Sequence, residues 1–532
     1  MAKNRLIVFL IISAFSFVLV LSRFFYWQII RGPELSALAQ KQRTQFLEVA
    51  APRGKIYASD GQALVLNKPS FMLYTYLPQV EEELSSLANR LAPILAEDQT
   101  TEIENETDQK KRIVDEELRL KEQLSSDRKW MIIKRKVDEN QKDQVDQLKI
   151  SGLGFESETS RDYPEASMAA QLLGFVGQNE TGQPQGYFGL EGFYNQQLTG
   201  LPGLIMEEKG IGGQFIFNSK RVKENMNPGL NLVLYLDRVA QFILEEELVD
   251  GVERYGAQSG WGVIMTPDGQ VLAMAGVPSY DPSDYSSFES QFFANPVVAK
   301  PFEPGSIFKP IVMASALDLG LVEPDSKCDQ CAGPKLIAGH QIRTWNDQYY
   351  PDTTMTEVIV HSDNVGMVFV AEKLGRDQMI ESLEKFGLDQ KTGIDLQDEA
   401  NISLRPKSQW YPIDVASASF GQGISTTAIQ LIRAFATLAN DGKISQPKLV
   451  KTIQKAPGQE QPGPKIDQEK IISSKTCQEI TQMLFETVEN GDAKWTKPKN
   501  LTVAGKTGTA QIAIEGNYDE SKTIASFIGF AP

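Results

Sequence analysis

An apolar stretch near the N-terminus restricts the fold of this chain more than any other feature. Residues 6–22 are apolar or small without interruption, and residues 24–30 continue the run past Arg23. A stretch of about 20 such residues can cross a bilayer as a helix, because a helix satisfies its own backbone polar groups there. Lys3 and Arg5 precede the stretch, which predicts a cytoplasmic N-terminus and about 500 residues on the far side of the membrane.

A cleaved signal peptide is the alternative for the same stretch. Ala37-Leu38-Ala39 resembles a cleavage site, but it lies far beyond the apolar residues. The apolar region of a signal peptide also spans only about 7–15 residues. We therefore favour an uncleaved anchor over residues 1–30.

The length and net charge of the chain limit the number of domains and the kinds of ligand to expect. The 532 residues suffice for two or three domains, and the net charge of −16 argues against nonspecific binding to nucleic acid. Only two histidines and three cysteines are present, so we expect neither a metal site nor a cofactor. Cys328 and Cys331 form one C-x-x-C pair, which is a local disulfide or two buried thiols.

The first part of the chain shows fold signals but no catalytic constellation before residue 225. Asp60-Gly61 predicts a hairpin turn, residues 130–133 predict a strand, and the acidic run 97–117 predicts a solvated helical insertion. We expect a non-catalytic pedestal or dimerisation-like domain over residues 31–225.

A boundary is expected near Asn227-Pro228-Gly229, and a second domain over residues 226–532. Residues 230–236 alternate like a strand, and Asp237 is a predicted cap for a helix that runs to about Tyr255. Residues 261–265 and 271–275 flank a Pro-Asp-Gly turn, which predicts a β-hairpin in the core of a sheet.

Ser306 and Lys309 are the first candidate catalytic pair. Pro304-Gly305 breaks the chain just before the serine, and an apolar helix is expected to follow. Residues three apart share a helix face, so the hydroxyl and the amine can meet. A serine needs a neighbouring base to act as a nucleophile, and burial favours the neutral amine of a lysine. The alternative interpretation of Ser306 is a simple helix N-cap.

The spacing Ser-x-x-Lys by itself is weak evidence, because it also occurs at Ser126, Ser382 and Ser445. Ser126 lies in a charged run, Ser382 among charged helix residues, and Ser445 has a proline inside the motif. For these three we expect a solvated surface.

Two further segments carry candidate site residues. Ser362 and Asn364 follow His361, and the alternative for this segment is again a helix cap. A Ser-His pair is discounted, because sequence neighbours do not face each other on a helix. Lys-Thr-Gly occurs at Lys391 and at Lys506, and only the second lies in an extended apolar context suited to a strand.

Together, Ser306-x-x-Lys309, Ser362-x-Asn364 and Lys506-Thr507-Gly508 stand in the order used by penicillin-binding proteins and serine β-lactamases. The chain resembles the class B penicillin-binding proteins over most of its length, through the anchor and the segments at Arg53-Gly54, 161–164, 189–191, 421–424 and 439–442. The resemblance implies an α+β fold, with a pedestal followed by a five-stranded antiparallel sheet flanked by helices.

The function implied by this resemblance is that of a peptidoglycan D,D-transpeptidase. Ser306 would attack a D-Ala-D-Ala stem peptide, Lys309 would be its base, and Ser362 would pass on the proton. Asn364 and Lys506 would hold and polarise the substrate, while Thr507, Gly508 and Thr509 would bind it. The implied partners are stem peptides, β-lactams, the membrane and a membrane glycosyltransferase of the division or elongation machinery.

Two alternatives remain from other classes of protein. A serine β-lactamase would hydrolyse the acyl-enzyme, although such enzymes lack an anchor and a pedestal. A β-lactam sensor or inactive scaffold would keep the fold without turnover. The rate of deacylation and the formation of cross-links distinguish the three.

The end of the chain carries a last expectation. Residues 523–530 predict a strand that pairs with the Lys506 strand, after a polar turn at 516–519. In the proteins that the chain resembles, another strand and a helix follow. We expect this sequence to be a shortened copy with an unfinished, aggregation-prone sheet edge.

Overall fold

The computed structural model describes residues 2–96, 106–208, 221–456, 459–491, 493–514 and 517–531. The chain divides into two compact units, which are described separately. One comprises residues 1–54 and 199–229, and the other comprises residues 55–198 and 230–532. The predicted boundaries of the anchor at residue 30 and of the pedestal at residue 225 stay predictions.

The first unit contains the N-terminal helix and a small sheet. The helix comprises α1 (Ala2–Phe25) and a π-helical turn, η1 (Tyr26–Ile30), and α2 (Gly32–Arg43) follows. The segment Lys3–Ile30 is long enough to cross a membrane, and an 18-residue window within it has a mean hydropathy of 2.5. Arg23 lies over the rings of Tyr26 and Trp27, so the charge is placed beside aromatic residues as an interfacial position requires. The sheet has the order β1 (Thr44–Val49), β8 (Gly203–Glu208), β9 (Arg221–Glu224).

The second unit begins with a sheet of seven strands that joins distant parts of the chain. Its order is β17-β16-β10-β2-β3-β4, and β5 pairs with β3. The Asp60-Gly61 turn connects β2 to β3 as predicted, and the predicted strand at 130–133 is the start of β4. The bounds are β2 (Ile56–Tyr57), β3 (Ala63–Tyr76), β4 (Trp130–Val137), β5 (Leu153–Asp162), β10 (Asn231–Leu234), β16 (Val450–Ala456) and β17 (Gln459–Pro462).

Three helices pack against the β3–β4 part of this sheet around a core of their own. They are α3 (Leu84–Leu95), α4 (Glu106–Leu124) and α5 (Glu139–Gln147). Leu120 and Leu124 of α4 are buried in this core, so the helix is anchored by its apolar face. The predicted helical insertion is confirmed for residues 106–117, and residues 97–105 lie outside the described ranges.

A buried ion pair joins two segments that the sequence analysis singled out. Arg161 of β5 donates through Nε to Glu191 Oε1 at 2.7 Å, and through Nη1 to Asn67 Oδ1 at 2.7 Å. Glu191 belongs to the short helix α7 (Gly189–Phe193). The two charged side chains are only 5% and 0% exposed. A buried charge that loses its partner is costly, so each side chain depends on the other.

We expect Arg161→Ala to destabilise the second unit by about 3 kcal/mol, because Glu191 would keep a buried charge without its main partner. The measurement is thermal unfolding followed by circular dichroism. The matched control is Arg254→Ala, because Arg254 and Asp250 form an ion pair at 3.6 Å that is about two-thirds exposed. Equal melting temperatures for the two variants would contradict the assigned role of the buried pair.

The helices and strands that directly follow β5 in the chain are short. They are α6 (Ala170–Leu173), β6 (Phe175–Gln178), β7 (Pro184–Tyr187) and α8 (Asn195–Thr199). The predicted Asp237-capped helix is α9 (Arg238–Tyr255), whose cap accepts from the N–H groups of Val239 and Ala240. The predicted hairpin is β11 (Gly260–Met265) with β12 (Val271–Val277).

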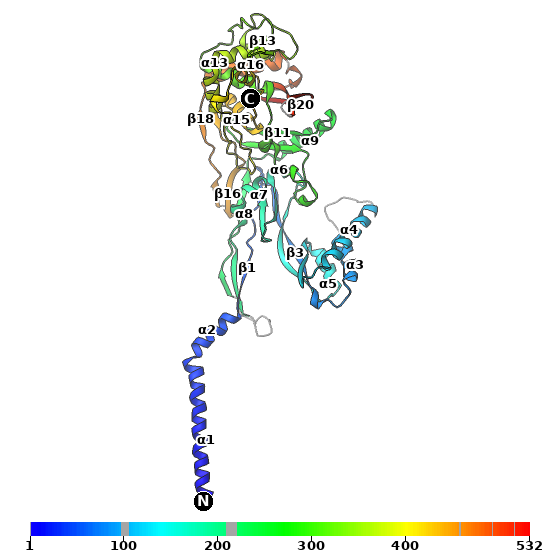
Figure 1. The fold of residues 1–532 in the computed structure, drawn as a ribbon, viewed down its shortest axis with the longest axis vertical. Helices are drawn as coiled ribbons and strands as arrows, with labels where there is room; N and C mark the ends of the chain where they lie inside the picture. Colours follow the sequence, from blue (N-terminus) through cyan, green and yellow to red (C-terminus); the bar gives the residue numbers. More distant parts are fainter. Residues whose placement is uncertain are drawn as a thin grey trace. The chain divides into compact units, whose positions relative to one another are not determined.

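Helices form most of the regular secondary structure between β12 and β19, and α13, α15 and α16 gather at one end of the second unit (Figure 1). Every residue of α11 from Lys309 to Leu317 is buried, which confirms the predicted buried helix. The bounds are α10 (Pro296–Ala299), α11 (Lys309–Asp318), β13 (Lys335–Ile337), β14 (His340–Ile342), α12 (Met355–Val360), α13 (Asn364–Lys385), α14 (Pro412–Ala418), α15 (Ala428–Ala439), β15 (Lys443–Ser445), β18 (Gln468–Lys470) and α16 (Ser474–Asn490).

The last two strands form a long antiparallel hairpin, β19 (Ala504–Ile514) with β20 (Asn517–Phe530). Lys506 pairs with Ile528, so the predicted partnership is confirmed. The predicted turn at 516–519 is too long, because residues 517–519 already pair with β19 and residue 516 lies outside the described ranges. Among the described residues, β11 pairs only with β12, and β20 only with β19, so these strands form two hairpins and not the single five-stranded sheet that the resemblance implied.

Cys328 and Cys331 form a local disulfide, the first of the two alternatives, and both side chains are fully buried. The bridge lies in the segment between α11 and β13. The third cysteine, Cys477, is a buried thiol on α16, where burial raises its pKa to about 11.

Candidate active site

Ser306 lies on a tight turn that leads directly into the buried helix α11. The turn is the 3-10 helix η5 (Gly305–Phe308), and the Lys309 N–H donates to the carbonyl of Ser306. Gly305 has a φ of +58°, a left-handed conformation that glycine adopts without a steric cost. Ser306 is half-buried, whereas Lys309 is fully buried. The turn therefore leaves the serine partly open and puts the lysine beneath it.

Lys309 joins the turn to the second motif. Its Nζ donates to the carbonyl oxygen of Ser362 at 2.5 Å and lies 3.1 Å from Ser362 Oγ. Ser362 connects α12 to α13, has a φ of +57°, and is 5% exposed. A left-handed conformation is uncommon outside glycine, and such strain is concentrated at functional sites. The hydroxyl and the amine are thus held together in an environment largely closed to water.

The segment 362–364 contains one residue with a structural role, Asp363, between two candidate site residues. Asp363 Oδ1 caps α13 by accepting from the N–H groups of Val365 and Gly366. The predicted helix cap is therefore correct for Asp363, which leaves Ser362 and Asn364 for other roles. Asn364 Nδ2 donates to the carbonyl of Arg343 at 2.9 Å.

The Asp363 carboxyl also shapes the charge of the site. Burial raises the pKa of Asp363, and the two capping N–H groups and the Lys309 charge act in the opposite direction. The Asp363 carboxyl therefore contributes to the electrostatic environment of the Lys309 amine.

The third motif lies on β19, alongside the Ser306 turn. A Cβ at Gly508 would stand 2.9 Å from Ile307 Cγ2 and 3.1 Å from the Ile307 nitrogen, so only glycine lets the strand approach this closely. A Cβ at Gly305 would likewise stand 3.2 Å from the Thr509 carbonyl oxygen. Lys506 is fully buried, with Nζ 3.3 Å from the Thr507 carbonyl oxygen.

The structure therefore brings all three predicted motifs to one place. Lys309 links the first to the second, and Gly508 packs against the first from the other side. Thr507 is half-buried and Thr509 is exposed, so hydroxyl groups line an open side of the turn. Within the described ranges no cluster of three or more acidic, histidine or cysteine side chains is placed to hold a metal ion.

Two of the discarded Ser-x-x-Lys motifs are not where we expected them. Ser126 is exposed as predicted, but Ser382 is 8% exposed and Ser445 is 3% exposed, so both are buried rather than solvated. Ser382 faces the interior from a helix whose adjacent residues are charged, because neighbours on a helix point in different directions. Ser445 ends β15 and accepts a hydrogen bond from Asn440 Nδ2. Neither lies on the turn that meets β19.

The loop after α14 is a part of the site to which sequence reasoning gave no role. The Gly421 carbonyl accepts from the Gly305 N–H at 3.0 Å, and a Cβ at Gly421 would stand 2.1 Å from the Gly305 oxygen. The Gly423 N–H donates to the Glu303 carboxylate at 3.1 Å. The two glycines in Gly421-Gln422-Gly423 were a visible signal, but their contact with the Ser306 turn depends on packing.

His361 does not form a Ser-His pair in this site. Its ring stacks on that of Tyr350 with centroids 4.8 Å apart and an interplanar angle of 19°. The first Lys-Thr-Gly, at Lys391, lies in a loop where Thr392 is held by Glu399, as expected for a segment outside the site.

Comparisons with known proteins agree with this arrangement. Residues 48–234 match the penicillin-binding protein dimerisation domain, and residues 260–532 match the penicillin binding protein transpeptidase domain. The chain is 30% identical to stage V sporulation protein D of Bacillus subtilis, over 100% of this chain and 80% of that protein. It is 27% identical to the probable peptidoglycan D,D-transpeptidase PenA of Neisseria gonorrhoeae, over 100% of this chain and 86% of that protein.

A solved structure supports the fold. Penicillin binding protein 3 of Mycobacterium tuberculosis, in complex with aztreonam, superposes with a TM-score of 0.67 at 24% identity, covering 91% of this chain and 88% of that one. A match to the dimerisation domain followed by a match to the transpeptidase domain, which contains the Ser306–Lys309 turn, defines the class of penicillin-binding proteins. The chain belongs to the penicillin-binding protein transpeptidase family, in its class B.

Proposed function

We propose that this chain is a peptidoglycan D,D-transpeptidase that cross-links stem peptides through an acyl-enzyme on Ser306. The observation that carries the proposal is the buried contact with Ser362 made by Nζ of Lys309, the residue that directly follows the Ser306 turn. The relatives named as transpeptidases support the reaction class. The assignment of each residue below is part of the proposal.

In the first half-reaction, the neutral amine of Lys309 takes the proton of Ser306. Ser306 Oγ bonds to the carbonyl carbon of the penultimate D-Ala, and the peptide bond to the terminal D-Ala breaks. The leaving nitrogen needs a proton, and Ser362 can relay it from Lys309 because Oγ is within hydrogen-bond reach of Nζ. In the second half-reaction, the amine of a neighbouring stem peptide attacks the ester and Ser306 regains its proton.

Substrate binding falls to the residues that surround the turn. Asn364 holds a substrate amide, and Lys506 supplies positive potential from its buried position. Thr507 and Thr509 bind the terminal carboxylate, and the backbone N–H groups of Ser306 and Thr509 stabilise the oxyanion. The glycine at 508 lets β19 lie close enough for these donors to face one carbonyl. β-Lactams resemble D-Ala-D-Ala and acylate Ser306 in the same way.

The anchor helix places this chemistry outside the cell in our proposal. Lys3 and Arg5 keep the N-terminus in the cytoplasm, so the enzyme acts on the outer side of the bacterial cytoplasmic membrane. Glycan strands must be polymerised there before they are cross-linked. We therefore include a membrane glycosyltransferase of the division or elongation machinery as partner.

The test is a reconstituted reaction with the full chain in lipid nanodiscs, nascent glycan carrying pentapeptide stems, and a separate glycosyltransferase. We expect released D-Ala and cross-linked dimers in equal amounts. D-Ala release or β-lactam hydrolysis without dimers would make the chain a hydrolase. Stable acylation by penicillin with no dimers and no D-Ala would make it a sensor. Either result would overturn the proposal.

A further inference from the structure

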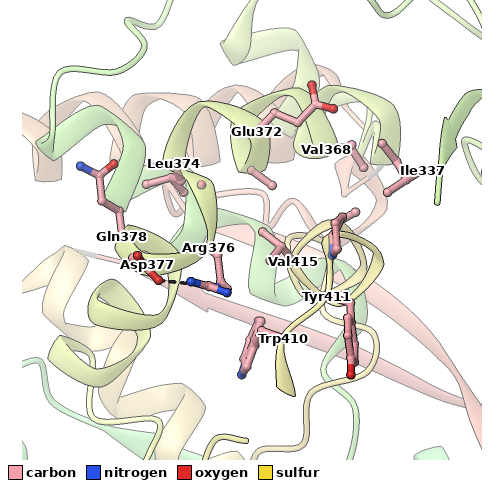
Figure 2. Close-up of a pocket in the computed structure, with 14 residues that line it drawn as sticks. Ile337, Val368, Glu372, Leu374, Arg376, Asp377, Gln378, Trp410, Tyr411 and Val415 are labelled. Carbon is pink, nitrogen blue, oxygen red and sulfur yellow. Dashed lines mark hydrogen bonds and ion pairs between the residues drawn. The ribbon is translucent and has the colours of Figure 1, made fainter. Parts of the chain in front are cut away.

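A cavity lies in the helical part of the second unit, and none of the residues of the three motifs lines it. Its volume is about 520 Å³, within the range of sites that bind small molecules, and α13, α14 and β13 surround it (Figure 2). Its walls are mainly apolar, with Val368 and Leu374 on one side and Trp410 and Val415 on the other. Trp410 is 4% exposed, so the indole is a fixed part of the wall.

Charged groups are confined to the rim of this cavity. Glu372 is paired with Lys335 at 2.5 Å, which neutralises it. Arg376 donates through Nε to Asp377 at 3.1 Å, and Figure 2 shows its guanidinium turned toward the Trp410 side of the cavity. This hydrogen bond uses Nε and leaves the two terminal amino groups in the fork geometry that suits a carboxylate or sulfonate. The two ion pairs leave the rim without net charge, and Arg376 offers its terminal amino groups to an anionic head above an apolar, aromatic floor.

Both walls lead directly to the catalytic residues. α13 starts at Asn364, and Val368 lies one turn further along the same helix. α13 bends at Gly375, whose φ of 69° and ψ of 172° are not helical, and this bend borders the cavity. α14 ends at Ala418, three residues before Gly421, whose carbonyl accepts from Gly305 next to Ser306. The separation of α13 and α14 thus bears on two of the three motifs.

We propose that this cavity is a regulatory site for a small amphipathic acid with a flat apolar body. A ligand held between α13 and α14 stabilises the arrangement described here, in which Lys309 contacts Ser362 and Gly421 supports the Ser306 turn. A ligand shifts a conformational equilibrium toward the state that it binds. Bound ligand should therefore raise the rate of acylation, an effect that rests on the proposed function.

The probe is anilinonaphthalene sulfonate, added to the full chain in nanodiscs, with empty nanodiscs as the blank. We expect saturable fluorescence with a dissociation constant on the order of tens of micromolar. Arg376→Gln should weaken binding about tenfold, and its control is Arg254→Gln, another exposed arginine with an acidic partner. Ala416→Leu should also weaken binding, because it fills the cavity from α14.

The coupling is measured as the rate of labelling by a fluorescent penicillin, with and without saturating probe. We expect at least a twofold rise in the parent chain and in Arg254→Gln, and no rise in Arg376→Gln. Binding that is equally tight in Arg376→Gln and the parent would overturn the site. Unchanged or slower labelling on saturation would overturn its regulatory role. A chain that is never labelled would refute the proposed function, while the binding titration would still decide whether the cavity takes the acid.

Discussion

Ser306→Ala is expected to abolish covalent labelling by a fluorescent penicillin while the melting temperature stays close to that of the parent chain. The hydroxyl sits on a turn that leads into a fully buried helix, and a half-buried Oγ contributes little to that packing. Without the oxygen no ester can form, so the loss should be complete rather than partial. The measurement is labelling followed by gel fluorescence, with circular dichroism to verify the fold.

The matched control for this variant is Ser382→Ala. Ser382 also begins a Ser-x-x-Lys motif and is buried, but it lies on α13 away from β19. Labelling should remain at the parent level in this variant. Persistent labelling of Ser306→Ala, or a labelled peptide that maps to Ser126, Ser382 or Ser445, would refute the assignment of the nucleophile.

Lys309→Arg is expected to slow penicillin acylation by about a thousandfold, the size of a general-base contribution. Arginine retains the positive charge but does not release its proton in proteins, so it cannot accept the proton of Ser306. The larger guanidinium must also enter a site where Nζ already lies 2.5 Å from the Ser362 carbonyl oxygen. The rate is measured by stopped-flow labelling across a range of penicillin concentrations.

Two further variants separate the chemical role of Lys309 from its packing. Lys391→Arg is the control, because this exposed lysine begins the other Lys-Thr-Gly segment and should leave the rate unchanged. Lys309→Met removes the amine but keeps the length of the side chain, and it should be as slow as Lys309→Arg. Near-parent acylation in Lys309→Arg would show that Lys309 acts only through its charge.

Local features of this protein were predictable from residues close together in the chain. The anchor helix, the β11–β12 hairpin and the Asp237 cap of α9 each depend on patterns that span fewer than about 30 residues, where backbone geometry sets the outcome. The Ser306–Lys309 spacing belongs to this group, because one helical turn relates the two residues. The order of the three motifs also identified the family before any contact was known.

Side-chain burial was predicted less well where it depends on which face of an element meets the core. Charged neighbours made Ser382 look solvated, but its position on α13 turns it inward. The polar residues 517–519 suggested a turn, yet pairing with residues 512–514 extends them into β20. In both cases tertiary packing overrides what the immediate neighbours indicate.

The sequence by itself determined which residues could perform the chemistry, because the order of three motifs singled out one of its four Ser-x-x-Lys pairs. Only the tertiary structure decided that Lys309 reaches Ser362, 53 residues later. It also decided that β19 packs beside Ile307 at Gly508. The hydrogen bond from Gly305 to Gly421 likewise depends on tertiary packing. The physical reason is that local spacing follows from fixed backbone geometry. Contacts across long separations instead depend on how buried helices and strands fill space around a common core.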